Sequence, residues 1–450
     1  MAKAKIFYEC QHCGMTSPRW MGKCTGCGAW DSMIEVKEAP EAKNVRGVVA
    51  NAKTRETSGA IPIDQVEEDH FLRYTTNETE LDRVLGGGLV AGSLVLVGGS
   101  PGVGKSTLLL KIAANLAESG KRVLYVSAEE SAGQIRLRAE RIGALKSNLM
   151  LLNEINLETI KEELAGNYDA AVIDSIQTLY SGELSAAPGS VSQVREITFE
   201  LMRIAKERAV AMFIIGHITK EGSIAGPRVL EHMVDTVLYF EGDASDELRV
   251  LRAFKNRFGS TSEVGIFEMT REGLKSAGNV GGRFFTRREN KSGSAATVVM
   301  EGTRPLVLEV QALVSEAYGN PRRSCTGFDS GRLTMLLALL EKKLELPFNR
   351  YDVFINLAGG IRVNETAADL AVIAAILSSF RNRPIGEKTL FIGEVSLIGD
   401  IREVSSLDAR LSEAASQGFD KAVVPRKPLS APASVKCYVA EEVAKVIDWM

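Results

Sequence analysis

The stretch Gly98–Thr107 constrains the fold more than any other part of this sequence. It follows the apolar run Leu94–Val97 and precedes a helical pattern that starts at Leu108. A strand, a glycine-rich turn and a helix start in this order predict a P-loop, whose backbone N–H groups curl around phosphate oxygens. We therefore expect a nucleoside triphosphate to be bound by Gly98, Gly99, Ser100, Pro101, Gly102, Val103, Gly104, Lys105, Ser106 and Thr107.

Catalysis at a P-loop needs side chains from neighbouring strands as well. We expect Lys105 to reach the β- and γ-phosphates, and Ser106 to hold magnesium together with Asp174, which ends the apolar run at 170–173. Glu129 follows the second predicted strand, at 122–127, and is the expected base that orients water. Glu130 is the competing candidate, and either carboxylate could instead simply stabilise a helix N-terminus.

Four of the six cysteines form two pairs with the spacing of a metal-binding ribbon. Cys10 and Cys13 make the first pair, and Cys24 and Cys27 make the second. Four thiolates suit a structural, tetrahedral Zn²⁺ site with no open coordination position. Redox disulfides or an iron site are the alternatives. A ribbon this small is expected to need its metal to fold, with Trp20 and Trp30 as its apolar packing.

The composition fits an ordinary globular protein and sets few further limits. Apolar residues make up 45% and charged residues 25% of the 450 residues, and no apolar run is long enough to span a bilayer. The first residues contain no secretory signal, so we expect a cytoplasmic protein without a membrane partner. The net charge of −3 gives no global sign of nucleic-acid binding, which would have to use local basic patches.

The pattern along the chain predicts three α/β or metal-binding domains and two linkers. Strand and helix signals alternate in the central segment, which implies a parallel sheet flanked by helices. The expected division is a zinc ribbon at 1–34, a linker at 35–70, a P-loop ATPase domain at 71–273, a linker at 274–294 and a second α/β domain at 295–450.

Two further motifs carry a resemblance to a known family. One is Glu80–Gly88, before the P-loop, and the other is Lys255, Asn256, Arg257, Phe258 and Gly259, read as KNRFG. The central segment resembles the RecA-type ATPases, and the whole chain is similar to the bacterial RadA (Sms) family of recombination-repair proteins. The resemblance implies a homo-oligomeric ring, expected to be a hexamer, with nucleotide between subunits. Lys255 and Arg257 would then act in trans on a neighbour's γ-phosphate; without the resemblance, residues 255–257 would be an exposed turn after a strand.

The same resemblance suggests a phosphate sensor and DNA contacts. His217 ends a predicted strand where RecA-like proteins keep a polar γ-phosphate sensor, although an ordinary strand-end histidine is an equal alternative. Single-stranded and branched DNA, including recombinase–DNA intermediates, are the implied partners. The candidate DNA contacts are Lys220 and Arg228 in one loop, and the basic residues Arg287, Arg288, Arg322 and Arg323 further along the chain.

The C-terminal segment is similar to the proteolytic domain of Lon protease, but it lacks the catalytic pair. Ala367 stands where the serine nucleophile should be, and Asp408 stands at the position of the lysine base. Since neither side chain can replace the lost group, proteolysis is not expected. The segment is expected to serve oligomerisation or DNA binding instead.

These observations together predict a DNA-dependent ATPase that moves along DNA. By resemblance it would promote branch migration and heteroduplex extension in recombination and break repair, using ATP, Mg²⁺ and Zn²⁺. An ATP-switched DNA clamp or adaptor that does not translocate is the main alternative. A KaiC-like signalling ATPase and an ATP-dependent protease are the others.

Overall fold

The structure is a computed structural model, and the chain divides into two compact units. The first unit is Met1–Ala244, Arg249–Thr261 and Met269–Ser276, and the second is Ser245–Leu248, Ser262–Glu268 and Ala277–Met450. The described residues are 6–10, 15–30, 32–37, 71–184, 187–217, 229–242, 248–270, 272–277, 291–358, 362–363 and 365–449.

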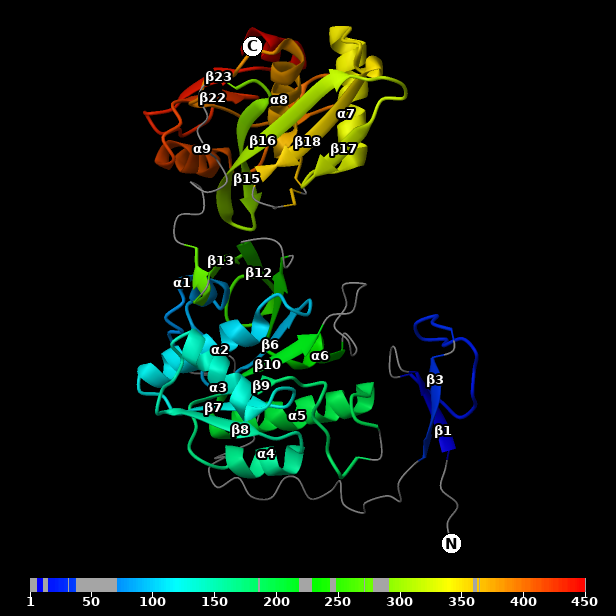
Figure 1. The fold of residues 1–450 in the computed structure, drawn as a ribbon, viewed down its shortest axis with the longest axis vertical. Coiled ribbons are helices and arrows are strands. Elements are labelled where there is room, and N and C mark those ends of the chain that lie inside the picture. Colours follow the sequence, from blue (N-terminus) through cyan, green and yellow to red (C-terminus); the bar gives the residue numbers. More distant parts are fainter. Residues whose placement is uncertain are drawn as a thin grey trace, which may run out of the picture. The chain divides into compact units, whose positions relative to one another are not determined.

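The centre of the fold is a nine-stranded sheet with the order β14-β13-β12-β11-β6-β10-β9-β7-β8 (Figure 1). The strands from β8 to β11 in this order are parallel, whereas β12 pairs antiparallel with β11. Their bounds are β6 (Leu94–Gly99), β7 (Val123–Ser127), β8 (Leu149–Asn153), β9 (Ala170–Asp174), β10 (Ala211–His217), β11 (Thr236–Glu241), β12 (Leu248–Asn256), β13 (Val264–Thr270) and β14 (Gly273–Ser276). The sheet therefore combines the predicted parallel core with an antiparallel extension that the alternating pattern did not predict.

Helices cover this parallel sheet, and side-chain caps set where several of them begin. They are α1 (Thr79–Val84), α2 (Lys105–Glu118), α3 (Ala132–Arg141), α4 (Leu157–Leu164), α5 (Val191–Arg208) and α6 (Val229–Met233). Ser131 forms a capping box with Gln134 at α3, and Asn156 and Ser190 cap α4 and α5. Every residue of β6, β7 and β9 is buried, as expected for parallel strands covered on both faces.

The cysteine-rich segment forms a small sheet of its own with the order β2-β1-β3. Its strands are β1 (Ile6–Cys10), β2 (Thr16–Ser17) and β3 (Met33–Lys37). Cys10, Cys24 and Met33 are buried at its centre. The predicted packing role of the tryptophans is wrong, because Trp20 is 55% and Trp30 is 74% exposed. Methionine and cysteine side chains fill this small interior instead.

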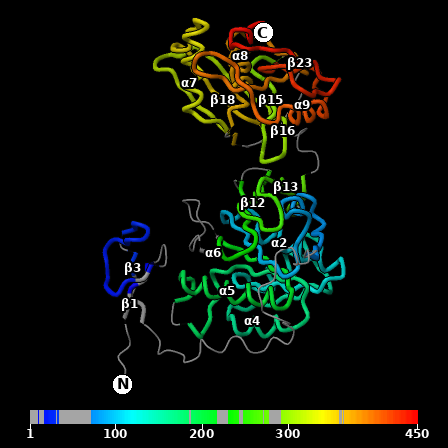
Figure 2. The backbone as a smooth tube through the Cα atoms, turned by 180° about the vertical axis from the view of Figure 1, so that it is seen from behind, coloured from blue at the N-terminus to red at the C-terminus, as the bar shows by residue number. Residues whose placement is uncertain are grey.

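The second unit contains a seven-stranded sheet with the order β17-β18-β16-β15-β19-β22-β23 (Figure 2). Its strands are β15 (Ser294–Glu301), β16 (Arg304–Glu316), β17 (Arg323–Thr326), β18 (Tyr351–Leu357), β19 (Thr389–Phe391), β22 (Lys421–Val424) and β23 (Lys436–Val439). Its helices are α7 (Ser330–Leu344), α8 (Asp369–Arg381) and α9 (Leu407–Ser416). Helix α8 is buried along most of its length and contacts β15 and β16.

Among the described helices, none has the length and apolar character needed to span a membrane.

Candidate nucleotide-binding site

The P-loop lies between β6 and α2, and its backbone leaves the start of α2 open to an anion. Gly102 and Gly104 have φ angles of +79° and +109°, which glycine adopts without strain. Gly104 stands at the cap position, so α2 has no side-chain cap, and no acidic residue lies in its first turn. The first N–H groups of this 14-residue helix therefore have no capping side chain, which suits them to phosphate oxygens.

Lys105 lies inside this loop. Its Nζ donates to the carbonyl oxygens of Gly99 at 2.8 Å and Ser100 at 3.0 Å, and the residue is only 4% exposed. Burial lowers the pKa of Lys105, while the nearby Asp174 and Glu129 carboxylates act in the opposite direction. The structure thus holds the ammonium group against the loop that it would share with a phosphate.

Asp174 ends β9 and is buried beside the P-loop serine. Its Oδ2 accepts a hydrogen bond of 2.7 Å from Tyr125 Oη on β7, and its carboxylate also bonds the Ser106 hydroxyl. Burial raises the pKa of Asp174, and the hydrogen bonds from Tyr125 and Ser106 oppose that effect. Tyr125 was missed by sequence reasoning, because it lies within an apolar strand run and no local pattern marks it as a partner of Asp174.

The two competing carboxylates after β7 have different surroundings. Glu129 is exposed and accepts a short hydrogen bond from the Ser175 hydroxyl, next to Asp174. Glu130 instead forms an ion pair of 2.6 Å with Arg138 on α3. Since Ser127 of β7 pairs in register with Asp174 of β9, Glu129 lies at the same sheet edge as Asp174.

His217 ends β10, and its backbone pairs in register with Gly99 of the P-loop strand. The side chain of His217 lies outside what the structure describes, so its predicted sensor role remains a prediction. Lys105, Ser106, Glu129, Asp174 and the backbone of His217 are all at the carboxyl edge of the parallel strands, where ligands of open α/β sheets bind.

The KNRFG residues lie at the opposite edge of the sheet, near the amino ends of the parallel strands. Lys255 Nζ donates to the carbonyl oxygens of Glu231, His232 and Val234, at 2.9, 3.0 and 2.7 Å. Arg257 Nη1 lies 3.2 Å from Oδ1 of Asp235, which is buried. Lys255 and Asn256 belong to β12 and not to a turn.

Topology separates these cations from the P-loop of the same chain. Asp235 Oδ2 accepts from the Leu94 N–H at the start of β6, whereas Gly99 ends that strand. At about 3.3 Å per strand residue, the two ends lie about 16 Å apart. An arginine held at Asp235 therefore cannot contact a phosphate bound at its own P-loop. The structure does not bring Lys255 or Arg257 together with the other predicted catalytic residues.

The rest of KNRFG packs on the other family motif, Glu80–Gly88. Asn256 Nδ2 donates to the Val84 carbonyl at 3.1 Å. A Cβ atom on Gly259 would lie 2.8 Å from Gly86 Cα, so the two backbones touch where only glycine fits. Two motifs about 170 residues apart in sequence therefore form one structural element.

The cysteine cluster has the geometry of a thiolate metal site. The Sγ atoms of Cys10, Cys24 and Cys27 lie within 4.8 Å of one another, and Cys10 and Cys27 are 3.6 Å apart. Ligands on a tetrahedral Zn²⁺ with Zn–S bonds of about 2.3 Å are separated by about 3.8 Å, so this donor set fits zinc. Cys13, the fourth predicted ligand, lies outside the described residues.

The predicted DNA contacts divide into two groups. Lys220, Arg228, Arg287 and Arg288 lie outside the described residues. Arg322 is exposed on the second unit, and its backbone N–H donates to Asp352. Arg323 is 3.7 Å from Glu341, so its charge already has a partner.

Ion pairs flank Ala367, the residue expected at the position of the Lon nucleophile. Ala367 is buried in a short 3₁₀ helix, Thr366–Ala368. On one side, Glu365 receives two hydrogen bonds of 2.7 and 2.8 Å from the buried Arg410. On the other, the buried Asp369 is paired with Arg332. Asp408 accepts a hydrogen bond from the Ser430 N–H at 3.3 Å.

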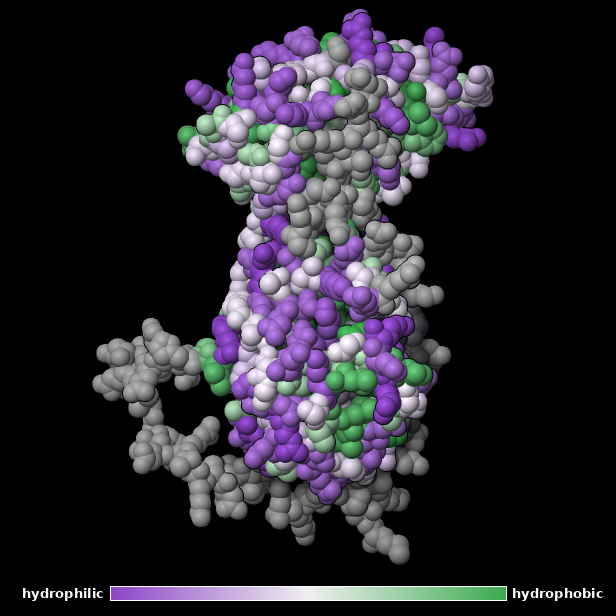
Figure 3. Space-filling model, turned by 60° about the vertical axis from the view of Figure 1, so that its left-hand side comes forward, coloured by the Kyte–Doolittle hydropathy of each residue, from purple (hydrophilic) through white to green (hydrophobic). Residues whose placement is uncertain are grey.

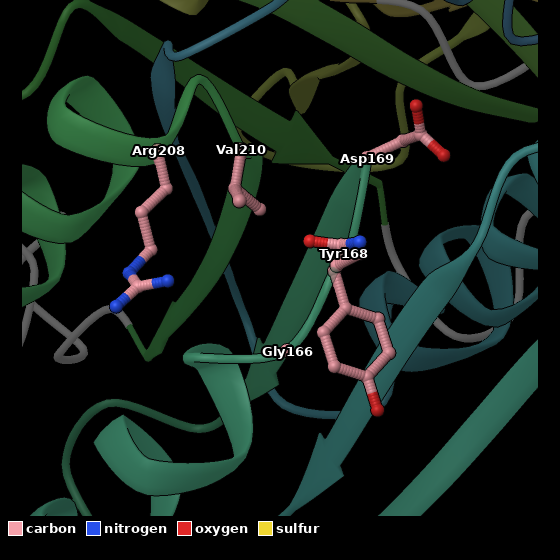
Figure 4. Close-up of a pocket in the computed structure, with 6 residues that line it drawn as sticks. Gly166, Tyr168, Asp169, Arg208 and Val210 are labelled. Atoms are coloured by element: carbon pink, nitrogen blue, oxygen red, sulfur yellow. The ribbon is translucent and has the colours of Figure 1, made fainter.

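A separate cavity of about 310 Å³ lies at the amino edge of the parallel strands (Figure 4). Tyr168 and Asp169 directly precede β9, Arg208 ends α5, and Val210 directly precedes β10. None of the predicted site residues lines this cavity. It is therefore distinct from the P-loop site.

Apolar side chains are exposed on the edge of the P-loop unit. They include Leu137 of α3, Met150 and Leu151 of the edge strand β8, and Ile155 just after it. Figure 3 shows apolar side chains gathered on one face of this unit.

Comparisons with family models agree with the phosphate-binding domain and the metal-binding ribbon described above. Three family models match: an AAA domain at residues 62–223, a rubredoxin metal binding domain at 8–35 and the ChlI subunit of Mg-chelatase at 335–428. A solved RadB recombinase structure is 25% identical and covers 45% of this chain and 99% of its own, with a TM-score of 0.37.

Full-length relatives are closer in sequence. The DNA repair protein RadA of Campylobacter jejuni is 61% identical over 452 residues and covers 100% of both chains. That of Bacillus subtilis is 50% identical over 430 residues and covers 94% of this chain and 93% of its own. This chain therefore belongs to the RadA family of DNA repair proteins.

Proposed function

We propose that this chain is a DNA-stimulated ATPase that assembles into a ring, moves along DNA in the cytoplasm and promotes branch migration during recombinational repair. Family membership supports the role in repair, since the relatives are named DNA repair proteins. The observation that carries the ATPase proposal is the edge where Lys105, Ser106, Asp174 and Glu129 meet around an uncapped helix.

The chain's own residues divide the work of ATP hydrolysis. Lys105 and the N–H groups at the start of α2 bind the β- and γ-phosphates. Glu129 accepts the proton of the attacking water, whose oxygen bonds to the γ-phosphorus as the bond to the β-phosphate oxygen breaks. Glu129 is exposed and accepts a hydrogen bond from Ser175, whereas Glu130 is already paired with Arg138. These differences favour Glu129 as the base.

Ser106 and Asp174 would hold Mg²⁺, because both offer oxygen ligands that this ion prefers and they hydrogen-bond each other beside the P-loop. A bound magnesium ion supplies positive charge that offsets the charge on the phosphates. Tyr125 holds Oδ2 of Asp174 in place, so that the carboxylate stays beside Ser106. Likewise, the sulfur cluster of Cys10, Cys24 and Cys27 and the rubredoxin-like match support a structural zinc in the ribbon, with Cys13 as the fourth ligand.

A second chain is needed to complete the proposed site. Lys255 and Arg257 lie at the opposite edge from their own P-loop, which supports their action on a neighbour's γ-phosphate. A closed ring, a hexamer by resemblance, satisfies this arrangement for every subunit. The second unit, with alanine at the nucleophile position, would serve assembly or DNA contact instead of proteolysis, with Arg322 as a candidate DNA contact.

The test is ATP turnover of the purified chain with no DNA, linear single-stranded DNA and branched DNA. We expect stimulation by DNA that falls as salt rises, and displacement of a strand from a forked substrate. Lys105→Ala should abolish both activities. Equal turnover with and without DNA would overturn the proposal. DNA-stimulated turnover without strand displacement would favour the clamp alternative. Cleavage of casein would favour the protease alternative.

A further inference from the structure

Lys255 uses its whole hydrogen-bonding capacity within its own chain. A lysine ammonium has three N–H donors, and three backbone carbonyl oxygens accept from Lys255 Nζ, at 2.7–3.0 Å. Glu231 and His232 belong to the end of α6, and Val234 directly follows that helix. The last carbonyls of a helix lack partners within the helix and carry partial negative charge, so a cation is favoured there.

The same segment is held by other groups, which makes its position dependent on a few identifiable bonds. Tyr239 Oη donates to the Glu231 carboxylate at 2.7 Å. Asp235 accepts from the Leu94 N–H at 3.1 Å and pairs with Arg257 and with Lys206. Lys255 is the group that binds the helix end itself, and it does so from the neighbouring strand β12.

The two KNRFG cations therefore differ in what they can do without rearrangement. Arg257 donates from Nη1 to Asp235, and 51% of its side chain is exposed. Since a guanidinium has five N–H donors, Arg257 can keep Asp235 and also bind a phosphate. Lys255 can donate to a phosphate only by giving up at least one carbonyl of α6.

We propose that the C-terminal end of α6 is a resting binding site for Lys255, and that Lys255 leaves it when it binds a neighbour's phosphate. Asp235 is the positioning residue that keeps Arg257 in place during this exchange. Binding of nucleotide by one subunit then loosens α6 of the next. This inference rests on the proposed action of Lys255 in trans. It adds a route by which the nucleotide state changes residues 229–235, about 20 residues earlier in the chain and directly after the predicted DNA loop that contains Lys220 and Arg228.

Hydrogen exchange of the full-length chain tests the proposal without relying on activity. The reporter is the peptide covering 229–235, whose Val234 and Asp235 N–H groups are hydrogen-bonded. In the nucleotide-free protein, Lys255→Ala should raise exchange in this peptide about tenfold. Adding a non-hydrolysable ATP analogue, Mg²⁺ and single-stranded DNA should raise exchange in the unaltered protein toward the same level and leave the variant unchanged.

Arg252→Ala is the matched control, because Arg252 lies on the same strand and pairs with Glu241, 2.9 Å away. It should leave exchange at 229–235 unchanged. Tyr239→Phe, which removes the bond to Glu231 of α6, should increase exchange in a protein that keeps Lys255. Unchanged exchange in nucleotide-free Lys255→Ala overturns the resting site, and no response of the unaltered protein to nucleotide overturns the release. If Lys255→Ala raises exchange yet hydrolyses ATP normally, the action of Lys255 in trans fails, and the release fails with it.

Discussion

Tyr125 donates a hydrogen bond of 2.7 Å to Asp174 Oδ2, and both groups are buried where β7 and β9 lie side by side. Burial and the Asp174 charge raise the pKa of Tyr125 well above its ordinary value, so the phenol stays protonated and remains a donor. It fixes the orientation of Asp174 and helps to keep that carboxylate ionised in a site that disfavours charge.

Tyr125→Phe should therefore weaken magnesium binding while preserving shape. Phenylalanine keeps the buried ring but removes the hydrogen bond, whose acceptor is a charged carboxylate. We expect the magnesium concentration for half-maximal ATPase activity to rise about tenfold. Binding of nucleotide in the absence of magnesium should not change. An unaltered magnesium dependence would show that the phenol has no positioning role.

Asp174→Asn should make the fold more stable at neutral pH while abolishing hydrolysis. Because burial raises the pKa of Asp174 in the folded chain, folding favours its protonated form. The stabilisation that protonated Asp174 gives the fold is complete at pH values below its pKa in the unfolded chain. It is lost as the pH rises through the pKa of Asp174 in the folded chain. The stabilisation by asparagine, measured by thermal unfolding without magnesium or nucleotide, should accordingly shrink as the pH is lowered. A constant difference across that range would contradict the assignment.

Glu129→Gln and Glu130→Gln separate the two adjacent carboxylates. The first removes the proposed base and should lower ATP turnover about 100-fold or more, with nucleotide binding retained. The second weakens the ion pair with Arg138 and should leave turnover within about threefold. Single-turnover hydrolysis together with nucleotide binding gives the comparison. A larger loss in the Glu130 variant would reverse the assignment.

Cys24→Ser should remove zinc from the ribbon, because the buried Cys24 thiolate belongs to the sulfur cluster. Metal analysis of the unaltered chain should find about one zinc per chain, as a four-thiolate site requires. The variant should lose it, with a change in the fluorescence of the ribbon tryptophans. The matched control is Cys437→Ser, because Cys437 lies in the second unit and is not one of the three cysteines of the sulfur cluster; this variant should keep its zinc.

Gly259→Ala should destabilise the fold by about 2 kcal/mol or more, since its new methyl group would overlap Gly86 Cα. Gly133→Ala is the control, because a Cβ there meets no atom within 4 Å and lies in α3. It should stabilise by up to about 1 kcal/mol. Denaturant unfolding measures both. An unchanged free energy of unfolding for Gly259→Ala would mean that the close contact between Gly259 and Gly86 is not needed for stability.

The elements that sequence predicted well are those with strong local signals. The strand ending at Asp174 was predicted with its observed bounds. The strand before the P-loop was predicted at Leu94–Val97, and it continues for two more residues, to Gly99. Parallel strands buried on both faces give continuous apolar runs, and glycine spacing marks the phosphate loop. The amphipathic patterns at 332–346 and 365–379 predict two helices, and the bounds of α7 and α8 lie within four residues of these ranges.

The elements that sequence missed depend on contacts between distant segments. The edge strand β8 was missed although it begins with four consecutive apolar residues, none of which is buried at this edge of the sheet. Nothing local distinguishes Tyr125 as a partner of Asp174, or Lys255 as a ligand of the α6 carbonyls, because each pair is joined only by the sheet. The tryptophans of the ribbon were misjudged because a metal-centred module needs little apolar interior.

The pairing of β12 beside β11 has a consequence for how this molecule can be regulated. It places the P-loop and the two cations, Lys255 and Arg257, at opposite edges of one sheet, too far apart to contact the same phosphate. A monomer therefore carries both parts of the proposed catalytic centre but cannot bring them together. Its chemistry would begin only at concentrations, or on templates, that bring copies head to tail.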